Sequence, residues 1–276
     1  MKILFKKIYK YFFKTFLLPF ANRRYVGSPA VFESVVSADT LKLFVFVIAF
    51  NDAQLIDLQN RALKKYLRDP YEYFVIDNSS RDDRSEKIKA YCLANKISYA
   101  RLPKNPGMDG SLSNGFALNW TYANLVRRFK PRVFGFIDHD LMPAENISIE
   151  GHLASGDSWG VISYHRTLRW FWQTRFSWWA GCAFFRLAHF GSKEPNFLPG
   201  WGIDTGGRVA LNPKVVLRLP EIYGHPVKPT IEIAPGVGVY QCGKFIHFAG
   251  ASDELEKLAR QKRWMERLLS GKVFSR

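Results

Sequence analysis

Hydrophobic residues in the first half of the chain come in blocks, and the spacing within each block predicts its secondary structure. Continuous runs rich in Val, Ile and Phe predict buried strands, whereas apolar residues that recur every three or four positions predict helices. The predicted strands are residues 41–50, 71–76, 97–102 and 133–138. The predicted helices lie between them, at residues 55–66, 83–95 and 113–129. Strands that alternate with helices in this way predict right-handed β-α-β units, and therefore an α/β fold with a mostly parallel sheet.

The rest of the chain has a different pattern. Residues 23–40 are polar and predict an irregular connection, and residues 141–252 predict short strands, glycine-rich joints and a dense aromatic block. Residues 253–276 predict a basic helix, because Asp253 and Glu256 have the spacing of an N-terminal capping box. The sequence has no internal repeat, so we expect a single domain with a helix at each end of the chain.

The N-terminal segment, residues 1–24, predicts an amphipathic helix. Most of its aromatic and aliphatic residues lie on one side of a helical wheel, and its lysines gather on the other: Lys2, Lys6, Lys7, Lys10 and Lys14. Such a helix suits the surface of an anionic membrane, although it could instead pack its apolar face onto the protein's own core. The lysines interrupt every apolar run, so no segment reaches the roughly 18 residues of a membrane-spanning helix. No signal-peptide cleavage site follows.

The net charge and the cysteine content of the chain indicate which partners and which cellular compartment to expect. The chain has 276 residues, enough for one large domain, and a formal net charge of +16. A charge of this size predicts an anionic partner, such as nucleic acid, a membrane surface or a phosphorylated substrate. The cysteines Cys92, Cys182 and Cys242 are widely spaced and odd in number. Without a secretory signal they predict reduced thiols, so we expect a peripheral protein on the cytoplasmic face of the membrane.

Three of the predicted strands end in polar residues, namely Asn51, Asp77 and Asp138. The carboxyl ends of parallel strands lie along one edge of the sheet, where open α/β sheets bind their ligands. The segment Val133–Asp140 is the most informative, because its apolar run ends in two aspartates, Asp138 and Asp140. Carboxylates at the end of a buried strand need a cation, and hard oxygen ligands favour Mg²⁺ or Mn²⁺ carrying phosphate. The alternative is a solvated turn.

Taken in order, these segments resemble the GT-A fold glycosyltransferases, in particular the inverting glycosyltransferase family 2. The resemblance spans residues 41–252 and rests on short motifs: Ile48–Asn51, Val75–Ser80, Asn105–Gly107, Asn114–Gly115, Asp138–Asp140, Gly181–Arg186, Asp204 and His247. It implies a Rossmann-like, mostly parallel sheet, with a nucleotide-binding half at 41–140 and a mixed acceptor half at 141–252. Two positions depart from the family pattern, since Ile203 replaces the usual Glu beside Asp204 and Ala49 replaces a Pro.

The resemblance also implies roles for single residues. Asp140 and His247 would bind a divalent metal, Mn²⁺ or Mg²⁺, which neutralises the diphosphate of the nucleotide sugar. The nucleotide would be bound by Phe50, Asn51, Asp77, Asn105 and Asp138. Two of these roles have alternatives on the residues alone, because Asp77 could cap the following helix and His247 could be a satisfied core histidine.

Asp204 would be the general base. An inverting transfer needs a carboxylate that takes the proton from the acceptor hydroxyl as it attacks the anomeric carbon. The alternative is a glycine-rich turn in which Asp204 only satisfies local N–H groups. Three tryptophans, Trp178, Trp179 and Trp201, could stack on sugar rings of the acceptor, although large aromatic residues are more often part of the core.

We therefore expect a metal-dependent inverting glycosyltransferase that moves a sugar from a nucleotide sugar to a glycan or lipid-linked acceptor, in surface polysaccharide biosynthesis. No nucleic acid partner is expected. The alternative suggested by charge is a basic α/β protein that binds RNA or anionic lipid without catalysis. Acids at successive strand ends argue against it, because they repel phosphates unless a metal intervenes. A nucleotidyltransferase would need a glycine-rich phosphate loop after the first strand, and Asn51–Ala53 lacks one.

Overall fold

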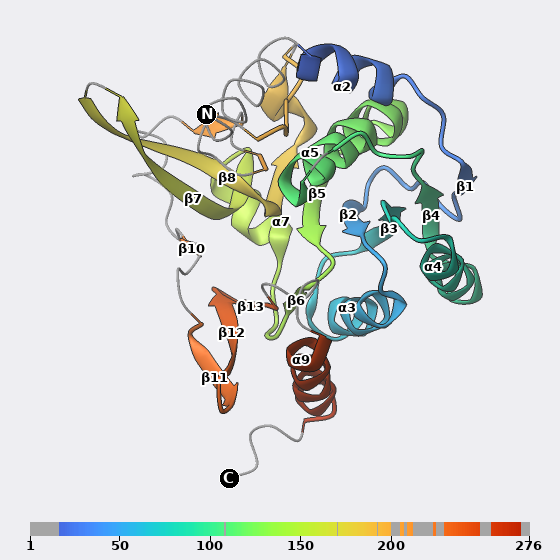
Figure 1. Cartoon of the computed structure of the whole chain (residues 1–276), viewed down its shortest axis with the longest axis vertical. Coiled ribbons are helices and arrows are strands. Elements are labelled where there is room, and N and C mark those ends of the chain that lie inside the picture. Colours follow the sequence, from blue (N-terminus) through green and yellow to red (C-terminus); the bar gives the residue numbers. More distant parts are fainter. Residues whose placement is uncertain are drawn as a thin grey trace, which may run out of the picture.

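The computed structural model describes residues 17–107, 109–169, 171–191, 193–199, 205–206, 209–211, 223–224, 229–248 and 255–271 (Figure 1). Most of the predicted N-terminal helix, residues 1–16, lies outside this range. So do two of the residues with predicted roles, Trp201 and Asp204. Their roles therefore stay predictions.

A parallel group of four strands forms the centre of the larger sheet. These strands are β2 (Leu43–Ala49), β3 (Tyr71–Asp77), β4 (Ser98–Arg101) and β5 (Val133–Asp138), in the order β4-β3-β2-β5. Each coincides with a predicted strand to within a few residues, so the predicted α/β pattern is confirmed. All seven residues of β2 are buried. A strand covered on both faces reads as a continuous apolar run, which explains why the sequence signal was clear.

Further strands, most of them paired in antiparallel direction, extend this sheet on both sides. Beyond β5 lie β8 (Phe171–Arg186) and β7 (Ser158–Arg169), with the short strands β9 (Ala210–Leu211) and β10 (Tyr223–Gly224) beside them. The prediction of short strands was wrong here, since β7 and β8 have 12 and 16 residues. Gly160 and Gly181 lie inside these strands rather than at joints between them. At Gly160 a side chain would collide with the Cys182 carbonyl of the neighbouring strand.

The predicted irregular connection at residues 23–40 also contains a strand. β1 (Phe32–Ser34) pairs with the outer edge of β4 in antiparallel direction. Phe32 lies beside the ring of Tyr99, and the Val31 amide donates to the Arg101 carbonyl. The strand therefore supplies partners for an edge that would otherwise expose unpaired backbone groups. Three residues are too few to give a recognisable alternation in sequence.

Helices cover both faces of the sheet. On one face lie α2 (Leu18–Val26) and α5 (Gly110–Thr121), which continues through the π-helical turn η2 (Tyr122–Val126) into α6 (Arg127–Phe129) (Figure 1). On the other face lie α3 (Ala53–Tyr66) and α4 (Asp82–Ala94). Alternate residues of β2 fill the two cores, with Phe44 and Phe46 on the α5 side and Val45 and Val47 on the α3 side. The predicted helices in this half are confirmed.

A second, smaller sheet lies below the first one in Figure 1 and contains β11 (Ile231–Ala234), β12 (Val237–Cys242), β13 (Phe245–His247) and β6 (Leu141–Pro143) in that order. The helix α9 (Leu255–Leu269) packs between this sheet and α3, which confirms the predicted C-terminal helix over its described part. Short helical turns at α7 (Ile149–His152), η3 (Leu153–Ser155) and η4 (Leu187–Phe190) complete the described elements. The domain boundaries at residues 41 and 252 stay predictions.

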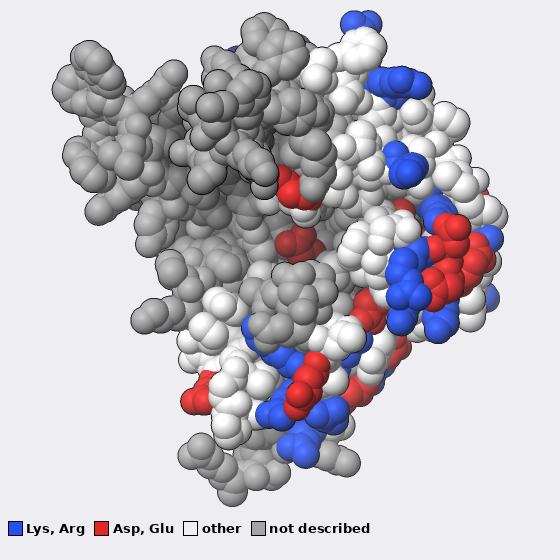
Figure 2. Space-filling model, in the orientation of Figure 1, with Lys and Arg blue, Asp and Glu red and all other residues white. Residues whose placement is uncertain are grey.

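Charges of both signs are interspersed on the surface where α3, α4 and α9 lie (Figure 2). Acidic atoms are also visible in a hollow near the middle of the same face (Figure 2). Within the part of the chain that the structure describes, no helix is both long and apolar enough to cross a membrane.

Candidate active site

A pocket of about 1150 Å³ lies at the carboxyl ends of the parallel strands. Its walls come from segments that follow β2, β3, β4 and β5: Ile48, Phe50, Asn78, Ser79, Ser80, Arg101, Lys104, Asn105, Asp138, His139 and Asp140. The N-terminal part of α5 and the exposed side chain of Val31, next to β1, close the remaining sides. The pocket is therefore at the edge where open α/β sheets bind ligands, as predicted.

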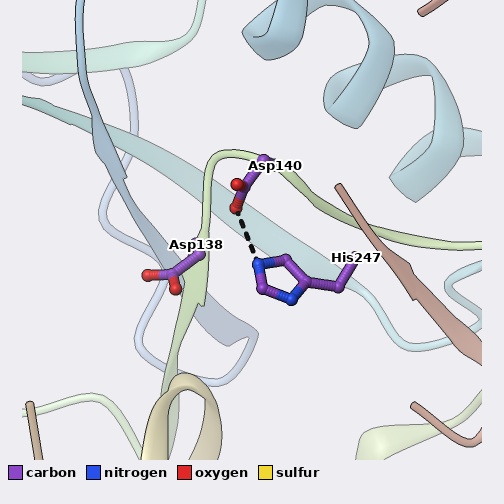
Figure 3. Close-up of side chains that lie close together, drawn as sticks. All are labelled: Asp138, Asp140 and His247. Atoms are coloured by element: carbon purple, nitrogen blue, oxygen red, sulfur yellow. Dashed lines mark ion pairs between the residues drawn. The ribbon is translucent and has the colours of Figure 1, made fainter. Parts of the chain in front are cut away.

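Asp138 and Asp140 line this pocket, and His247 lies close to both of them (Figure 3). Each offers one ligand atom, and the three atoms lie within 4.8 Å of one another. The His247 Nε2 atom is 3.4 Å from Asp140 Oδ1, and the two side chains face each other. This is the arrangement of a site that could hold a metal ion.

The position of His247 depends on the smaller sheet. β13 pairs with β6 so that His247 lies opposite Leu141, the residue after Asp140. The Phe248 amide also donates to the Asp140 carbonyl, at 2.9 Å. Two segments more than a hundred residues apart are thus joined at the place where β5 ends, and this pairing brings the imidazole to the carboxylate.

The charge states of Asp140 and His247 depend on each other. Burial raises the pKa of the Asp140 carboxyl, but His247 and His139 lower it more, so its pKa lies below the usual range. Burial lowers the pKa of His247, and Asp140 and Asp138 more than reverse this, so its pKa lies above the usual range. Each of the two pKa shifts thus favours the charged form of its own side chain. A divalent cation would take the place of the proton on His247.

Asp138 lies between a side chain of α5 and the backbone of β8. The Asn114 Nδ2 atom, from α5, donates to Asp138 Oδ1 at 3.3 Å. On the other side, a Cβ added at Gly181 of β8 would be 2.4 Å from Asp138 Oδ2 and 2.3 Å from the Trp179 ring. Only glycine leaves room for both side chains there, so β8 approaches the site as bare backbone.

The residues present fit a hard divalent ion. Two carboxylates and one imidazole supply three ligands, which leaves several positions of an octahedral shell open for water or phosphate oxygens. The contact with Asp138 fixes the Asn114 amide orientation, because only its NH₂ group can donate to a carboxylate. The Asn114 Oδ1 atom is then buried with no hydrogen-bond partner among the described residues. Such an orphaned acceptor beside the acids indicates that a bound ligand or metal-bound water completes the site.

Besides Asp138, three residues predicted to bind the nucleotide lie at or beside the pocket. Phe50 and Asn105 line it. The Asn105 amide is used within the protein, since it donates to Asn78 Oδ1 and the Ser113 carbonyl and accepts from the Gly107 amide. Asn105 therefore shapes the wall of the pocket.

Asn51 follows Phe50 in a left-handed conformation, with φ of 55°. Its backbone amide donates to Ser79 Oγ at 2.8 Å, and its side-chain Nδ2 donates to Ser80 Oγ at 3.0 Å. Both serines line the pocket. The loop after β2 is thus tied to the loop after β3. Direct contacts of Phe50, Asn51 and Asn105 with a nucleotide stay predictions.

Asp77 faces away from the pocket. Its side chain is 1% exposed, and its carboxylate accepts hydrogen bonds from the Ser79 amide and from the hydroxyls of Ser85 and Tyr99. All of these donors belong to the protein, so the carboxylate is already satisfied. Asp77 does not cap α4 either, because the N-cap position of that helix is Arg81. Its hydrogen bonds instead join the end of β3 to α4 and β4, and they leave no free oxygen for the predicted contact with a nucleobase.

The two described tryptophans of the predicted acceptor site differ in their surroundings. Trp178 is 2% exposed and packs in the core on the α5 side, in edge contact with Phe185. A side chain enclosed in this way has no open ring face for a sugar. Trp179 is 7% exposed, and its ring centroid is 4.8 Å from that of His247. Trp179 therefore packs against the ring of His247.

Sequence reasoning assigned no role to Asn114, Arg101 or Lys104, which all line the pocket. Asn114 lies in a motif of the resemblance, and its helical position gives no sign that it faces an aspartate two elements away. Arg101 ends a strand as Asp77 does, and its guanidinium contacts Asp82 at 2.6 Å. A cation at the end of β4 could have been noticed from sequence as a candidate partner for phosphate or base.

One family profile, described as "Glycosyl transferase family 2", matches residues 44–216, which is more than half of the chain. The match includes the strands β2 to β5 and both aspartates of the site, and it ends before β13 and α9. No curated protein matches the chain at a significant level.

Solved structures that match the chain include three glycosyltransferases. The mannosyltransferase PcManGT from Pyrobaculum calidifontis, solved with GDP-Man and Mn²⁺, is 15% identical, with 76% of this chain and 62% of that chain covered and a TM-score of 0.41. The mannosyltransferase Ktr4p from S. cerevisiae is 10% identical, with 94% and 92% covered and a TM-score of 0.40. A glycosyltransferase involved in the glycosylation of the major capsid of PBCV-1 is 12% identical, with 82% and 98% covered and a TM-score of 0.36. This chain thus spans less than two thirds of the first of the three.

Proposed function

Because the chain belongs to glycosyl transferase family 2, we propose that it is a metal-dependent inverting enzyme that transfers a sugar from a nucleotide sugar. Family membership establishes the GT-A type of α/β fold and the class of enzyme, a glycosyltransferase. It also removes the alternative of a basic binding protein without catalysis. The metal, the stereochemistry and the acceptor belong to the proposal, and we propose a glycan or lipid-linked acceptor in surface polysaccharide biosynthesis.

The observation that carries the proposal is the cluster of Asp138, Asp140 and His247 at the strand-edge pocket, which the two aspartates line. If the pocket binds a diphosphate, the two carboxylates would repel it unless a cation lies between them and the phosphate oxygens. Mn²⁺ or Mg²⁺ would supply positive charge to the departing diphosphate as the glycosidic bond breaks. Asp140 and His247 would hold this ion, with Asp138 next to the ribose or to a metal-bound water.

The residues of the pocket have separate tasks in this proposal. Arg101 and Lys104 contribute cationic side chains at the β4 end, while Phe50 and Ile48 offer apolar contacts. Asn114 orients Asp138 and keeps one carbonyl oxygen for the bound nucleotide sugar or its water shell. Because the Asp77 carboxylate is satisfied internally, the nucleobase would be recognised by other side chains of the pocket.

We propose Asp204 as the general base that takes the proton from the acceptor hydroxyl. Asp204 itself lies outside the described residues. The following two residues support the proposal, since Thr205 donates its hydroxyl to the Ser111 carbonyl on α5 and the Gly206 amide donates to the Phe197 carbonyl. Ser111 is three residues from Asn114, so this part of the chain is anchored close to the metal cluster.

We also propose that the enzyme binds peripherally to an anionic membrane surface on its cytoplasmic side. On α2, Phe20 is 70% exposed, and Arg23 and Arg24 lie three and four positions later on the same face. An exposed aromatic ring beside cations suits a lipid headgroup region. The full chain should sediment with vesicles containing phosphatidylserine but not with purely zwitterionic ones, and a Phe20→Ser variant should sediment less. Equal sedimentation with both vesicle types would contradict this part of the proposal.

The central test is a thermal-shift screen of nucleoside diphosphates with and without Mn²⁺. We expect at least one of UDP, GDP, ADP and CDP to raise the Tm only when Mn²⁺ is present, because the ion joins the diphosphate to the acids. At a ligand concentration of about 100 times the Kd, the stabilisation should be roughly 2.7 kcal/mol. If none of the four raises the Tm in the presence of Mn²⁺, the proposed function is wrong.

A further inference from the structure

An ion pair connects the C-terminal helix to the loop beside the pocket. On α9, Lys262 Nζ donates to Asp52 Oδ2 at 2.5 Å, across 210 positions of sequence. The two side chains are 12% and 22% exposed. Among the Lys and Arg ion pairs of the described residues, no other has both side chains this well shielded from solvent. Solvent screens such a pair much less than it screens the pairs on the outer surface.

The Asp52 carboxylate has a second task. Its Oδ1 atom accepts from the amides of Gln54 and Leu55, at 3.0 and 3.1 Å, so that Asp52 is the N-cap of α3. Its Oδ2 atom remains for Lys262. Both oxygens of the carboxylate are therefore fixed, one by the helix that follows and one by α9.

Asp52 directly follows the loop that forms part of the pocket. Phe50 lines the pocket, and Asn51 has a positive φ of 55°, a left-handed conformation that is uncommon for residues with a side chain but that Asn adopts more readily than most. On one side, Asn51 is held by its hydrogen bonds to Ser79 and Ser80. On the other side, the chain is held at Asp52. The shape of the loop thus depends on anchors at both ends.

The same helix contacts the smaller sheet, in which β12 pairs with the strand that carries His247. Gln261, next to Lys262 and fully buried, donates from Nε2 to the Gly238 carbonyl of β12 at 2.9 Å. Apolar residues of α9 share a core with α3 and with the residue before His247: Leu258, Met265, Leu268, Leu55, Leu58 and Ile246. The helix therefore contacts Asp52 and α3 on one side and the smaller sheet with His247 on the other. It does so although it lies beyond the region that matches the family profile.

We propose that Lys262 is a positioning residue which, through Asp52, holds Phe50 and Asn51 in the shape that binds the nucleotide. This inference rests on the proposed function, because it assumes that the nucleotide occupies the pocket. Without the ammonium group, Asp52 keeps its cap but loses its outer anchor. The loop then samples other conformations, and part of the binding free energy of the nucleotide is used to order it. The groups proposed for chemistry are untouched, so KM for the nucleotide sugar should rise while kcat changes little.

The test uses the full-length chain and isothermal titration calorimetry with UDP, GDP, ADP and CDP, each with Mn²⁺. For the nucleotide that binds best, Lys262→Met should weaken the affinity about tenfold, a typical size for coupling from a residue outside the ligand contacts. Lys262→Arg should restore most of it. Asp52→Asn should weaken binding as much as Lys262→Met, because Asn is an equally good N-cap but lacks the charge. The double variant should be no weaker than either single one.

Arg260→Met is the matched control. It removes a cation from the same helix and breaks the exposed pair of Arg260 with Glu256, yet it should leave nucleotide affinity unchanged. Wild-type affinity in a folded Lys262→Met protein would overturn the proposal, and so would equal losses in the Arg260→Met control. If Lys262→Met does not fold, Asp52→Asn and Lys262→Arg decide the question by the same criteria. A wild type that binds none of the four nucleotides with Mn²⁺ would instead overturn the proposed function together with this inference.

Discussion

Replacing Asp140 with alanine is expected to lower kcat by about a thousandfold or more, which corresponds to about 4 kcal/mol of transition-state stabilisation. The Asp140 side chain is 14% exposed and lies beside His247, which lowers the pKa of its carboxyl. Without it the site keeps one carboxylate and one imidazole, too few to hold a hard divalent ion against water. The charge that develops on the leaving diphosphate would then be uncompensated. Turnover of a nucleotide sugar with Mn²⁺ measures the effect.

A second measurement separates loss of metal from loss of fold. Mn²⁺ binding followed by electron paramagnetic resonance should weaken strongly in Asp140→Ala, while the circular dichroism spectrum stays native. Asp83→Ala is a suitable control, because the Asp83 side chain is 55% exposed and pairs only with nearby arginines on the surface. Its turnover should be unchanged. Full activity of Asp140→Ala would remove this residue from the metal site and with it the main support for the proposed function.

The central strands could be predicted because both of their faces are buried. β2 and β5 are covered by helices on either side, so almost every residue is apolar and the strand stands out from its polar ends. The long strands β7 and β8 are different, since glycines and polar residues interrupt their apolar pattern. Their length comes from pairing with each other, which local sequence does not reveal.

Asp77 and Asp138 show why equal sequence signals led to different outcomes. Both aspartates end a buried parallel strand, and both were predicted to face the nucleotide. In the sheet, Asp77 is in register with Ala49 and Asp138 is in register with Ile48. Residues in register point to the same face, and Ala49 and Ile48 are neighbours that point to opposite faces. Asp138 therefore lies with Ile48 on the pocket side, whereas Asp77 lies on the side of α4.

The same alternation separates Trp178 from Trp179. The two residues are adjacent in β8, so one enters the core on the α5 side and the other contacts His247. Composition alone could not assign the faces. His247 itself was suggested by the family resemblance, and the reason for its position is the pairing of β13 with β6. A pattern confined to one segment cannot predict a contact made by two short strands so far apart in sequence.

Replacing Asp204 with asparagine is expected to lower kcat about a thousandfold while leaving nucleotide and Mn²⁺ binding intact. A general base contributes on the order of 10²- to 10⁴-fold, and the amide of asparagine has nearly the shape of the carboxylate but cannot accept a proton. The anchors of the next two residues, at Ser111 and Phe197, do not involve the Asp204 side chain. The substitution should therefore preserve the local backbone, and the Tm should change little.

The two aspartate variants together distinguish the two proposed roles. Asp140→Ala should lose Mn²⁺ binding and turnover, whereas Asp204→Asn should lose turnover alone, because the proposed base would act on the acceptor and not on the metal. Calorimetry with the best nucleoside diphosphate and Mn²⁺ gives the binding constants, and turnover of the corresponding nucleotide sugar gives kcat. If Asp204→Asn retains full turnover, another group takes the proton. If it loses Mn²⁺ binding as Asp140→Ala does, the acid supports the metal site and the separation of roles fails.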